Sequence, residues 1–253
     1  TNEVRINQET GTLIRDGVPS IMNPDDKNAL EEAIRIKEKS GAEVVALSMG
    51  PPQAKDMLKE ALAMGADKAV LVSGREFGGS DTWATSTIIS AAIEKVGNYN
   101  IIFCGRQAID GDTAQVGPEI AEFLNLAQVT YVKDLEVKGD KLHVTRYTEY
   151  GDYVFEVATP VLLTAIKELN TPRYPSVKGI FEAYGHEGEE KIEVFGFADL
   201  EVDPTQIGLK GSPTNVFRSF APVKEGNFEI IEGNTNKEKA STLVSKLTDL
   251  NLI

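Results

Sequence analysis

Residues 43–73 of the chain, EVVALSMGPPQAKDMLKEALAMGADKAVLVS, carry the pattern that decides its fold class. The apolar run at 43–49 predicts a buried strand, which Gly50-Pro51-Pro52 ends. Apolar residues then recur at helical spacing from Met57 to Leu62, and a second buried strand is predicted at 68–73. A strand, a helix and another strand in succession are typical of a parallel sheet with crossover helices.

The same alternation extends through the first two-thirds of the chain. The further expected elements are a helix from Asn23-Pro24 to Gly41, a helix at 82–96 after the glycine-rich loop 74–81, a strand at 100–104, and a helix at 114–124. We therefore predict an α/β fold with a mostly parallel sheet and helices on both of its faces.

After about Val129 the pattern changes to an added β region. Strands are predicted at 132–137, 142–148, 153–158 and 161–165, with a hairpin turn at 138–141. Past Leu169 the composition is irregular and rich in proline, and a helical stripe returns only at 237–250. We interpret this stretch as an extended C-terminal arm that packs on another chain; the alternative is a long surface loop closed by a helix. The predicted domains are 1–190 and 191–253.

Composition excludes several classes of function. The chain has 253 residues, 41% of them hydrophobic, and a formal net charge of −13. Nucleic acid and acidic membrane surfaces are therefore not expected partners, and no apolar run approaches the roughly 18 residues of a membrane span. Cys104 is the only cysteine, which is compatible with a reducing compartment, and we predict the cytoplasm. The chain starts at Thr1 without Met, with a strand-like alternation at 3–7, so an upstream segment and a removed targeting peptide stay open.

The loop and helix start at 110–119, DGDTAQVGPE, are the strongest candidate for ligand binding. The segment follows a strand, where open parallel sheets bind ligands. Gly111 permits close backbone approach or positive φ, Asp112 or Thr113 can cap the helix, and Gly117 could let a nucleotide lie on its first turn. Free N–H groups at such a helix start bind phosphate, although a capped helix after a loop is the plainer alternative. Neither GxGxxG nor GxxxxGK[ST] is present.

Other chemistry-bearing residues have simpler explanations. His143 and His186 are expected to be solvent-exposed, and with Cys104 they make no zinc set, so no metal is predicted. Cys104 and Trp83 are expected in the core. Helix capping explains the acids at 110, 112 and 119 more simply than a metal or acid–base cluster. Ser48 and Ser80 lack a nearby histidine, so the chemistry is expected to lie on a cofactor.

Residues 104–119, CGRQAIDGDTAQVGPE, resemble the nucleotide-binding segment of the electron-transfer flavoprotein β subunit. The stretches 22–24 with 29–33, 61–67, 144–146, 160–165 and 172–174 agree with that family in the same order. The sequence departs from the family at its start, where members have a strand and a loop containing Lys-Gln-Val-Pro.

The resemblance implies a Rossmann-like, adenine-nucleotide-binding fold and a heterodimer with an α subunit that holds its own FAD. The form at 110–118 and the loop at 77–86 resemble the electron-bifurcating members, whose β subunit binds a second FAD. That reading implies hydride transfer from NADH, with electrons divided between ferredoxin or flavodoxin and, through the α-subunit FAD, an acyl-CoA, lactate or similar dehydrogenase. The alternatives are an ordinary member that holds structural AMP and a non-redox ATP-binding module of universal-stress type; a lone nicotinamide dehydrogenase is disfavoured.

The resemblance also implies site residues. Its nucleotide positions are Asn23, Pro24, Asp25, Asp26, Met49, Gly50, Ala108, Ile109, Asp110, Gly111, Asp112, Thr113, Ala114, Gln115, Val116, Gly117, Pro118 and Glu119. Asp81, Thr82 and Thr85 match positions near the flavin ring and the NAD site. Residues 173–183 match the loop that docks the partner dehydrogenase, with Val177 as its apolar anchor.

Overall fold

A computed structural model describes residues 21–139, 141–217 and 228–253. The strand predicted at 3–7 lies outside these residues. The chain divides into two compact units at 217/218. The first contains two sheets with their helices, and the second contains a single described helix. None of the described helices combines the length and the apolar character needed to cross a bilayer.

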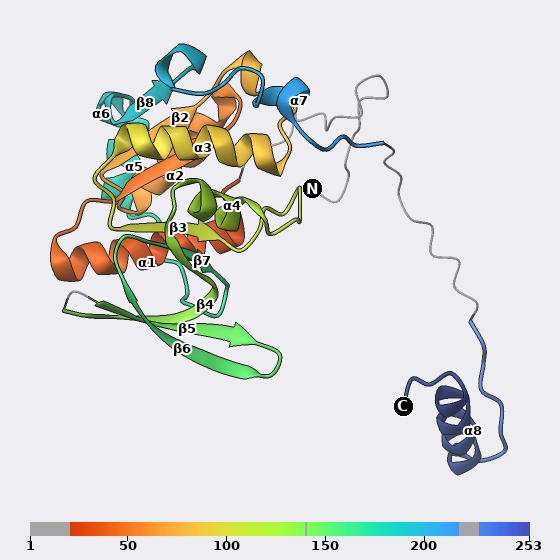
Figure 1. The fold of residues 1–253 in the computed structure, drawn as a ribbon. Coiled ribbons are helices and arrows are strands. Elements are labelled where there is room, and N and C mark those ends of the chain that lie inside the picture. The colour runs from red at the N-terminus through yellow and green to blue at the C-terminus, as the bar shows by residue number, and fades with distance from the viewer. Residues whose placement is uncertain (1–20, 140, 218–227) are drawn as a thin grey trace. The chain divides into compact units, whose positions relative to one another are not determined.

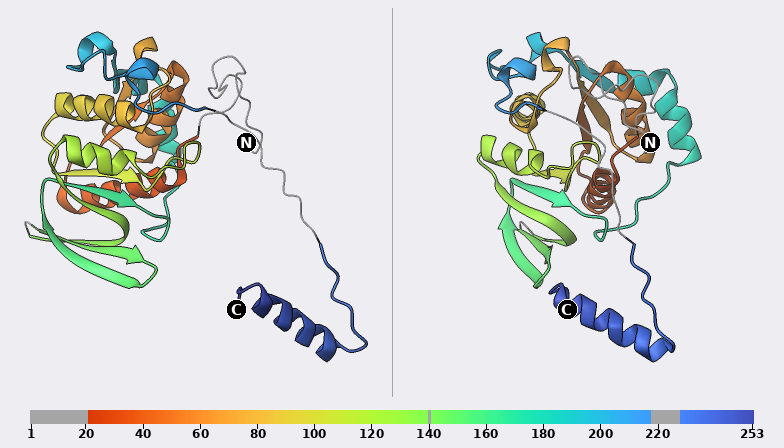
Figure 2. Two further views of the ribbon diagram at one scale, coloured as in Figure 1. Left: turned by 45° about the vertical axis from the view of Figure 1, so that its right-hand side comes forward. Right: turned by 90° about the vertical axis from the view of Figure 1, so that its right-hand side faces the viewer.

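The first sheet is parallel throughout. Its order is β1 (Val45–Met49), β2 (Lys68–Val72) and β8 (Ile192–Phe195). Helix α2 (Lys55–Met64) covers one face and α3 (Thr82–Val96) covers the other, as Figure 2 shows. Alternate residues of β2 join the two cores on its two faces, so the strand is buried from both sides. The predicted strand–helix–strand unit and its helices on both faces are confirmed.

The second sheet combines parallel and antiparallel pairs. Its order is β3 (Ile101–Gly105), β7 (Val161–Ala165), β4 (Ala127–Lys138), β5 (Lys141–Thr148) and β6 (Gly151–Ala158). The pairs β3–β7 and β7–β4 are parallel, and β4, β5 and β6 form an antiparallel meander. Helices α1 (Pro24–Ser40) and α4 (Val116–Phe123) supply apolar residues to its separate cores. The α/β class and the added β region are therefore confirmed (Figure 1).

The region after Leu169 is more ordered than predicted. It contains α5 (Val177–Tyr184), α6 (His186–Glu190), β8, a short 3-10 turn at Phe197–Asp199 and α7 (Gly208–Gly211). Two further 3-10 turns lie earlier in the unit, at Pro52–Ala54 and Arg75–Phe77. The expectation of an irregular stretch up to residue 237 is wrong, because β8 pairs with β2 and buries Ile192 and Phe195. The predicted domain boundary at 190/191 falls between α6 and β8, inside the first unit.

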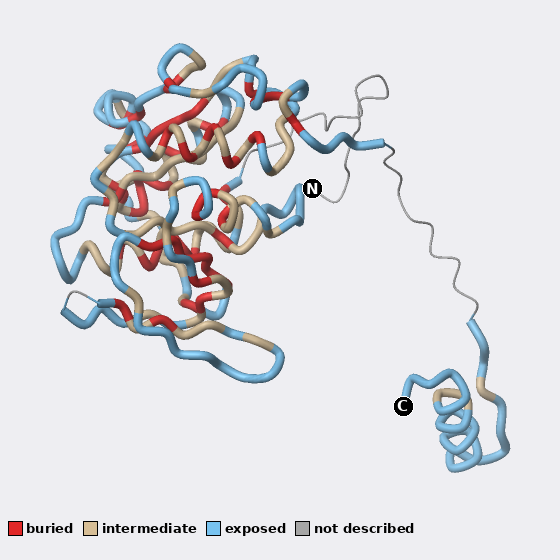
Figure 3. The backbone as a smooth tube through the Cα atoms, viewed as in Figure 1, coloured by how far each residue is buried: buried red, intermediate tan, exposed pale blue. Residues whose placement is uncertain are grey.

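The second unit contains α8 (Asn236–Asp249), as predicted. Thr235 caps the helix, since its side chain accepts a hydrogen bond from the Glu238 N–H. No residue of α8 is buried, and Figure 3 shows the helix almost wholly in the colours of exposed residues. Leu243 and Val244 are about half exposed, at 46% and 53%. The described residues of this unit therefore leave the apolar stripe of the helix largely exposed.

Candidate functional site

The start of α1 and the loop after β3 are joined by hydrogen bonds. Asn23 donates through Nδ2 to the Gln107 carbonyl at 2.8 Å and accepts from the Ile109 N–H at 3.2 Å. Asp26 accepts from the Gly105 N–H at 2.5 Å and from Asn23 Nδ2 at 2.7 Å. Asn23 and Asp26 thus shape the loop through contacts with protein groups.

Burial raises the pKa of the Asp26 carboxyl, and the bonds from Gly105 and Asn23 only partly oppose that rise. Gly105 itself permits this close approach. A Cβ atom at position 105 would lie 2.6 Å from the Asp26 nitrogen, which is shorter than real contacts allow. The start of α1 and the loop after β3, which the resemblance assigned to one nucleotide site, are therefore brought together, and Gly105 allows their close approach.

The loop at 108–115 has an unusual backbone. Asp112 and Ala114 adopt positive φ values of 54° and 55°, whereas Gly111, the residue expected to do so, does not. The expected cap by Asp112 or Thr113 is also wrong, because α4 begins two residues later than predicted, with Gln115 at its N-cap. The Asp112 carboxylate instead accepts a hydrogen bond from the Gln107 side chain.

This geometry leaves main-chain donors available at the start of α4. The Gln115 side chain makes no cap hydrogen bond, and the first N–H groups of a helix have no partner within it. No hydrogen bond is recorded from the N–H of Gly111 or Thr113 to any described residue, and a Cβ at Gly111 would meet open space. These donors and the helix dipole fit a phosphate group. Gly117 has a different environment: its missing Cβ faces Thr164 and Cys104, so it allows α4 to pack on the strands.

A second cluster joins the starts of α3 and α4. Thr82 Oγ1 donates to Glu119 Oε1 at 3.1 Å, and Ser86 Oγ donates to Glu119 Oε2 at 2.8 Å. Asp81 caps α3 by accepting from the Ala84 N–H, and it also accepts from both the N–H and the hydroxyl of Thr214. Burial opposes ionisation of Asp81, but these hydrogen bonds outweigh it and lower its pKa.

The remaining predicted residues have mixed surroundings. Met49 packs against the core that β2 and α3 share, and the Gly50 N–H donates to the Val72 carbonyl at 3.0 Å. Cys104 packs against the core of α4, as expected, and burial raises the pKa of its thiol. Trp83 was expected in the core and is 41% exposed, in edge-to-face contact with Phe123.

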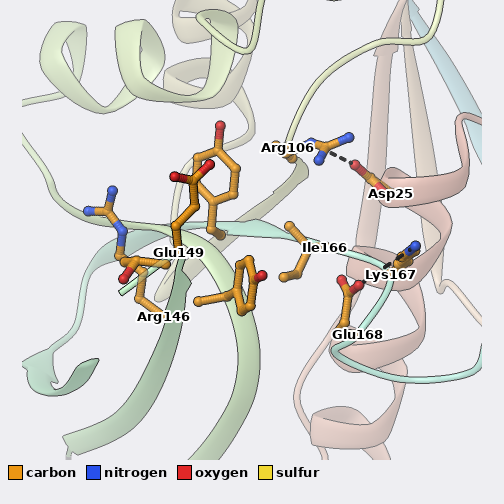
Figure 4. Close-up of a pocket in the computed structure, with 10 residues that line it drawn as sticks. Asp25, Arg106, Arg146, Glu149, Ile166, Lys167 and Glu168 are labelled. Carbon is orange, nitrogen blue, oxygen red and sulfur yellow. Dashed lines mark ion pairs between the residues drawn. The ribbon is translucent and has the colours of Figure 1, made fainter. Parts of the chain in front are cut away.

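A polar cavity of about 540 Å³ lies beside the start of α1. Figure 4 shows Arg106 and Asp25 on one side of it and Arg146 and Glu149 on the other. Arg106 Nε lies 3.4 Å from Asp25 Oδ2, and burial raises the pKa of Asp25 while the Arg106 charge opposes the rise. The Nε atoms of Arg106 and Arg146 are buried without a hydrogen-bond partner among the described residues. The cavity therefore places two arginine side chains beside acidic ones, with Arg106 in an ion pair with Asp25.

Sequence reasoning missed most of this cavity. Arg146 lies on β5, and Tyr131 lies at a β-bulge of β4 with a φ of 58°. Arg146 belongs to the stretch 144–146, which resembles the family, but nothing in its spacing marked it as a site residue. No group of three His, Cys, Asp or Glu side chains in the described part of the chain is arranged to hold a metal ion.

The predicted docking anchor lies on a helix and not in a loop. Val177 is the first residue of α5 and is 73% exposed. Phe181 and Tyr184 are also exposed, at 77% and 54%, and share its face of the helix at positions i+4 and i+7. Arg173 holds the preceding loop to α1 by ion pairs with Glu31 and Glu38 at 2.9 and 2.5 Å.

Comparison with known proteins decides the family. The model of the electron transfer flavoprotein domain matches residues 10–200. The chain belongs to the electron transfer flavoprotein β-subunit family. It is 59% identical, over 100% of its length and 95% of the relative, to the electron transfer flavoprotein subunit beta of Thermoanaerobacterium thermosaccharolyticum. The predicted family is therefore confirmed.

Two further relatives belong to named reductase complexes. The chain is 53% identical to the caffeyl-CoA reductase-Etf complex subunit CarD of Acetobacterium woodii. It is 49% identical to the acryloyl-CoA reductase electron transfer subunit gamma of Anaerotignum propionicum. Each match covers 100% of this chain and 95% of the relative. Relatives of this chain thus include proteins named as subunits of a caffeyl-CoA reductase and an acryloyl-CoA reductase.

Proposed function

We propose that the chain is the β subunit of an electron-bifurcating electron-transfer flavoprotein and holds FAD between the starts of α1, α3 and α4. The observation that carries the proposal is a set of main-chain donors, at Gly111, Thr113 and the first turn of α4, that have no hydrogen-bond partner within the part of the chain that the structure describes. These donors suit a diphosphate, which is the part of FAD that a backbone cradle can bind. Their position after β3 is the place where nucleotides bind in open α/β sheets.

The side chains around this cradle have separate tasks. Asn23 and Asp26 hold the loop in shape through Gln107, Ile109 and Gly105. Asp81, Thr82 and Thr85 lie at the start of α3, and this helix start is proposed to face the ring end of the dinucleotide. When bound, FAD accepts a hydride, with its two electrons, from NADH and can release them singly to two acceptors.

The proposed partners follow from the family and from the exposed surfaces. One electron passes to ferredoxin or flavodoxin and the other to the FAD of an α subunit, which serves an acyl-CoA, lactate or similar dehydrogenase. The names of the two reductase-complex relatives support a CoA-ester partner. Val177 and its neighbours on α5 are proposed to dock the dehydrogenase. Residues 191–253 are proposed to pack on the α subunit, and the complex is proposed to work in the cytoplasm.

The second candidate function is a non-bifurcating β subunit with AMP in the same cradle. AMP also carries a phosphate that the start of α4 would bind, so the donor set by itself suits both nucleotides. The resemblance at 110–118 and 77–86 to bifurcating members favours FAD.

Nucleotide content distinguishes the two candidates. The co-purified αβ complex is denatured, and the released FAD and AMP are counted per heterodimer by chromatography. Two FAD and no AMP support bifurcation. One FAD and one AMP would replace it with the ordinary electron-transfer role, and a colourless protein without an α partner would contradict both.

A further inference from the structure

Glu119 connects two helices that both begin at the candidate site. It lies in the first turn of α4, and its carboxylate accepts hydrogen bonds from Thr82 and Ser86 of α3. Thr82 and Ser86 are four residues apart, so they share one face of that helix. Ser86 is completely buried, whereas Thr82 is partly exposed and can be reached by a ligand.

The direction of these bonds fixes the chemistry that Thr82 can offer. A hydroxyl group has one proton to donate, and an ionised carboxylate can only accept. Because the proton of Thr82 points to Glu119 Oε1, only the lone pairs of its oxygen remain for another partner. The carboxylate of Glu119 uses its other oxygen for Ser86, which holds it in place.

We propose that Glu119 is a positioning residue that makes Thr82 a hydrogen-bond acceptor toward the ring of the bound dinucleotide. This inference rests on the proposed function, since it requires a flavin at the start of α3. A ring nitrogen that gains hydrogen on reduction changes from an acceptor into a donor. An acceptor beside it therefore stabilises the reduced cofactor relative to the oxidised one. The Thr82–Glu119 pair would in this way raise the midpoint potential of the flavin on this chain.

The variant Glu119→Gln tests the proposal. A glutamine amide can donate to the Thr82 oxygen, which releases the hydroxyl proton toward the cofactor. The midpoint potential of the FAD on this chain, measured by dye-equilibrated titration of the αβ complex, is expected to shift downward. Removal of a negative charge near the flavin would by itself shift the potential upward, because it favours the electron-rich form. The sign of the shift therefore separates positioning from simple charge.

A double-mutant comparison shows whether the effect passes through Thr82. In Thr82→Val the hydroxyl is absent, so Glu119→Gln in that background is expected to lose the downward shift. Thr87→Val is the matched control: it removes an exposed hydroxyl of α3 whose partner is the Trp83 carbonyl at 2.9 Å, so the potential should keep its wild-type value. Circular dichroism checks the folding of each variant.

The outcomes distinguish this inference from the function on which it rests. An upward or unchanged potential in Glu119→Gln, or an equal downward shift in the Thr82→Val background, would overturn the positioning role while two FAD per heterodimer remain. A wild-type complex that contains AMP and one FAD would overturn both proposals. A downward shift that requires Thr82, in a complex with two FAD, supports both.

Discussion

At the scale of single residues, the carboxyl of Asp26 links the first turn of α1 to the strand end at Gly105. Burial of this carboxyl favours its neutral form more than in an unfolded chain, although the 2.5 Å bond from the Gly105 N–H favours the ionised form. Its charge therefore opposes folding even though its hydrogen bonds support the site.

The pH dependence of Asp26→Asn tests this balance. With a raised folded pKa, the contribution of Asp26 to stability is complete below its ordinary pKa of about 4 and is lost as pH rises through the folded value. The asparagine keeps an acceptor for Gly105 and has no charge. The variant is expected to gain stability over the wild type as pH rises from about 4 to 7, measured by urea unfolding. Asp26→Ala, which lacks both the charge and the acceptor, is expected to be about 1–3 kcal/mol less stable than Asp26→Asn at every pH in this range.

Two glycines form a matched pair for the site. In Gly105→Ala the new Cβ would meet the Asp25–Asp26 backbone, so we expect a loss of about 1–3 kcal/mol in unfolding free energy. In Gly111→Ala the Cβ meets nothing and φ is not positive, so stability should change by less than about 0.5 kcal/mol. The nucleotide content of Gly111→Ala is expected to fall, because the methyl group points into the proposed cradle. A full nucleotide complement there would contradict the cradle.

At the scale of elements, α1 holds the segment before α5 along much of its length. Asn170 donates to the Asn28 carbonyl at 3.0 Å, and Arg173 binds Glu31, which is only 3% exposed. The hydroxyl of Ser176 then caps α5 by accepting from the Gly179 N–H. The exposed face of α5 is thus presented by a segment that is fixed on its inner side.

Arg173→Ala should loosen this segment without changing the cradle. Glu31 would keep Arg35 as a partner at 2.9 Å, so we expect a stability loss of about 1–3 kcal/mol. Affinity for the partner dehydrogenase, measured by calorimetry, is expected to fall several-fold while FAD content stays constant. Arg173→Lys, which cannot reproduce the two-sided contact, should lie between the wild type and the alanine variant. Equal loss of FAD and affinity would indicate general unfolding instead.

The elements that could be predicted from sequence are those with strong local patterns. The helix at 82–96 and the strand at 161–165 were predicted with the observed bounds, because both have clear ends: a glycine-rich loop precedes the helix and Gly97 follows it, and Pro160 precedes the strand. Strand β8 was missed since its four residues, IEVF, become a strand only through pairing with β2. The prediction that Asp112 caps a helix failed for a similar reason. Its carboxylate accepts a hydrogen bond from Gln107, and this contact cannot be predicted from sequence spacing.

At the scale of the whole molecule, the exposed apolar side chains mark where partners are expected. Val177 and Phe181 on α5 and Leu243 and Val244 on α8 belong to different units, and none of them is covered. Exposed apolar groups of this size are typical of surfaces that bind other proteins.

Val177→Ser tests the α5 surface in the assembled complex. Because the side chain is already exposed, unfolding free energy should change by less than about 0.5 kcal/mol. Binding of the dehydrogenase is expected to weaken about tenfold, as for an apolar anchor. Lys178→Ala, at the neighbouring exposed position, is the control and should leave affinity near the wild-type value. Unaltered binding of Val177→Ser would remove this residue from the docking surface.

The single helix α1 contacts both the loop beside the proposed cradle and the segment before α5. Its first turn is bonded to the loop beside the cradle, and Glu38, about 22 Å further along the axis, holds Arg173. A helix of this length is stiff, so a displacement of the loop at 105–109 would also move the other end of α1. The loop beside the proposed cofactor site and the segment that presents the α5 surface are thus fastened to opposite ends of one rigid element.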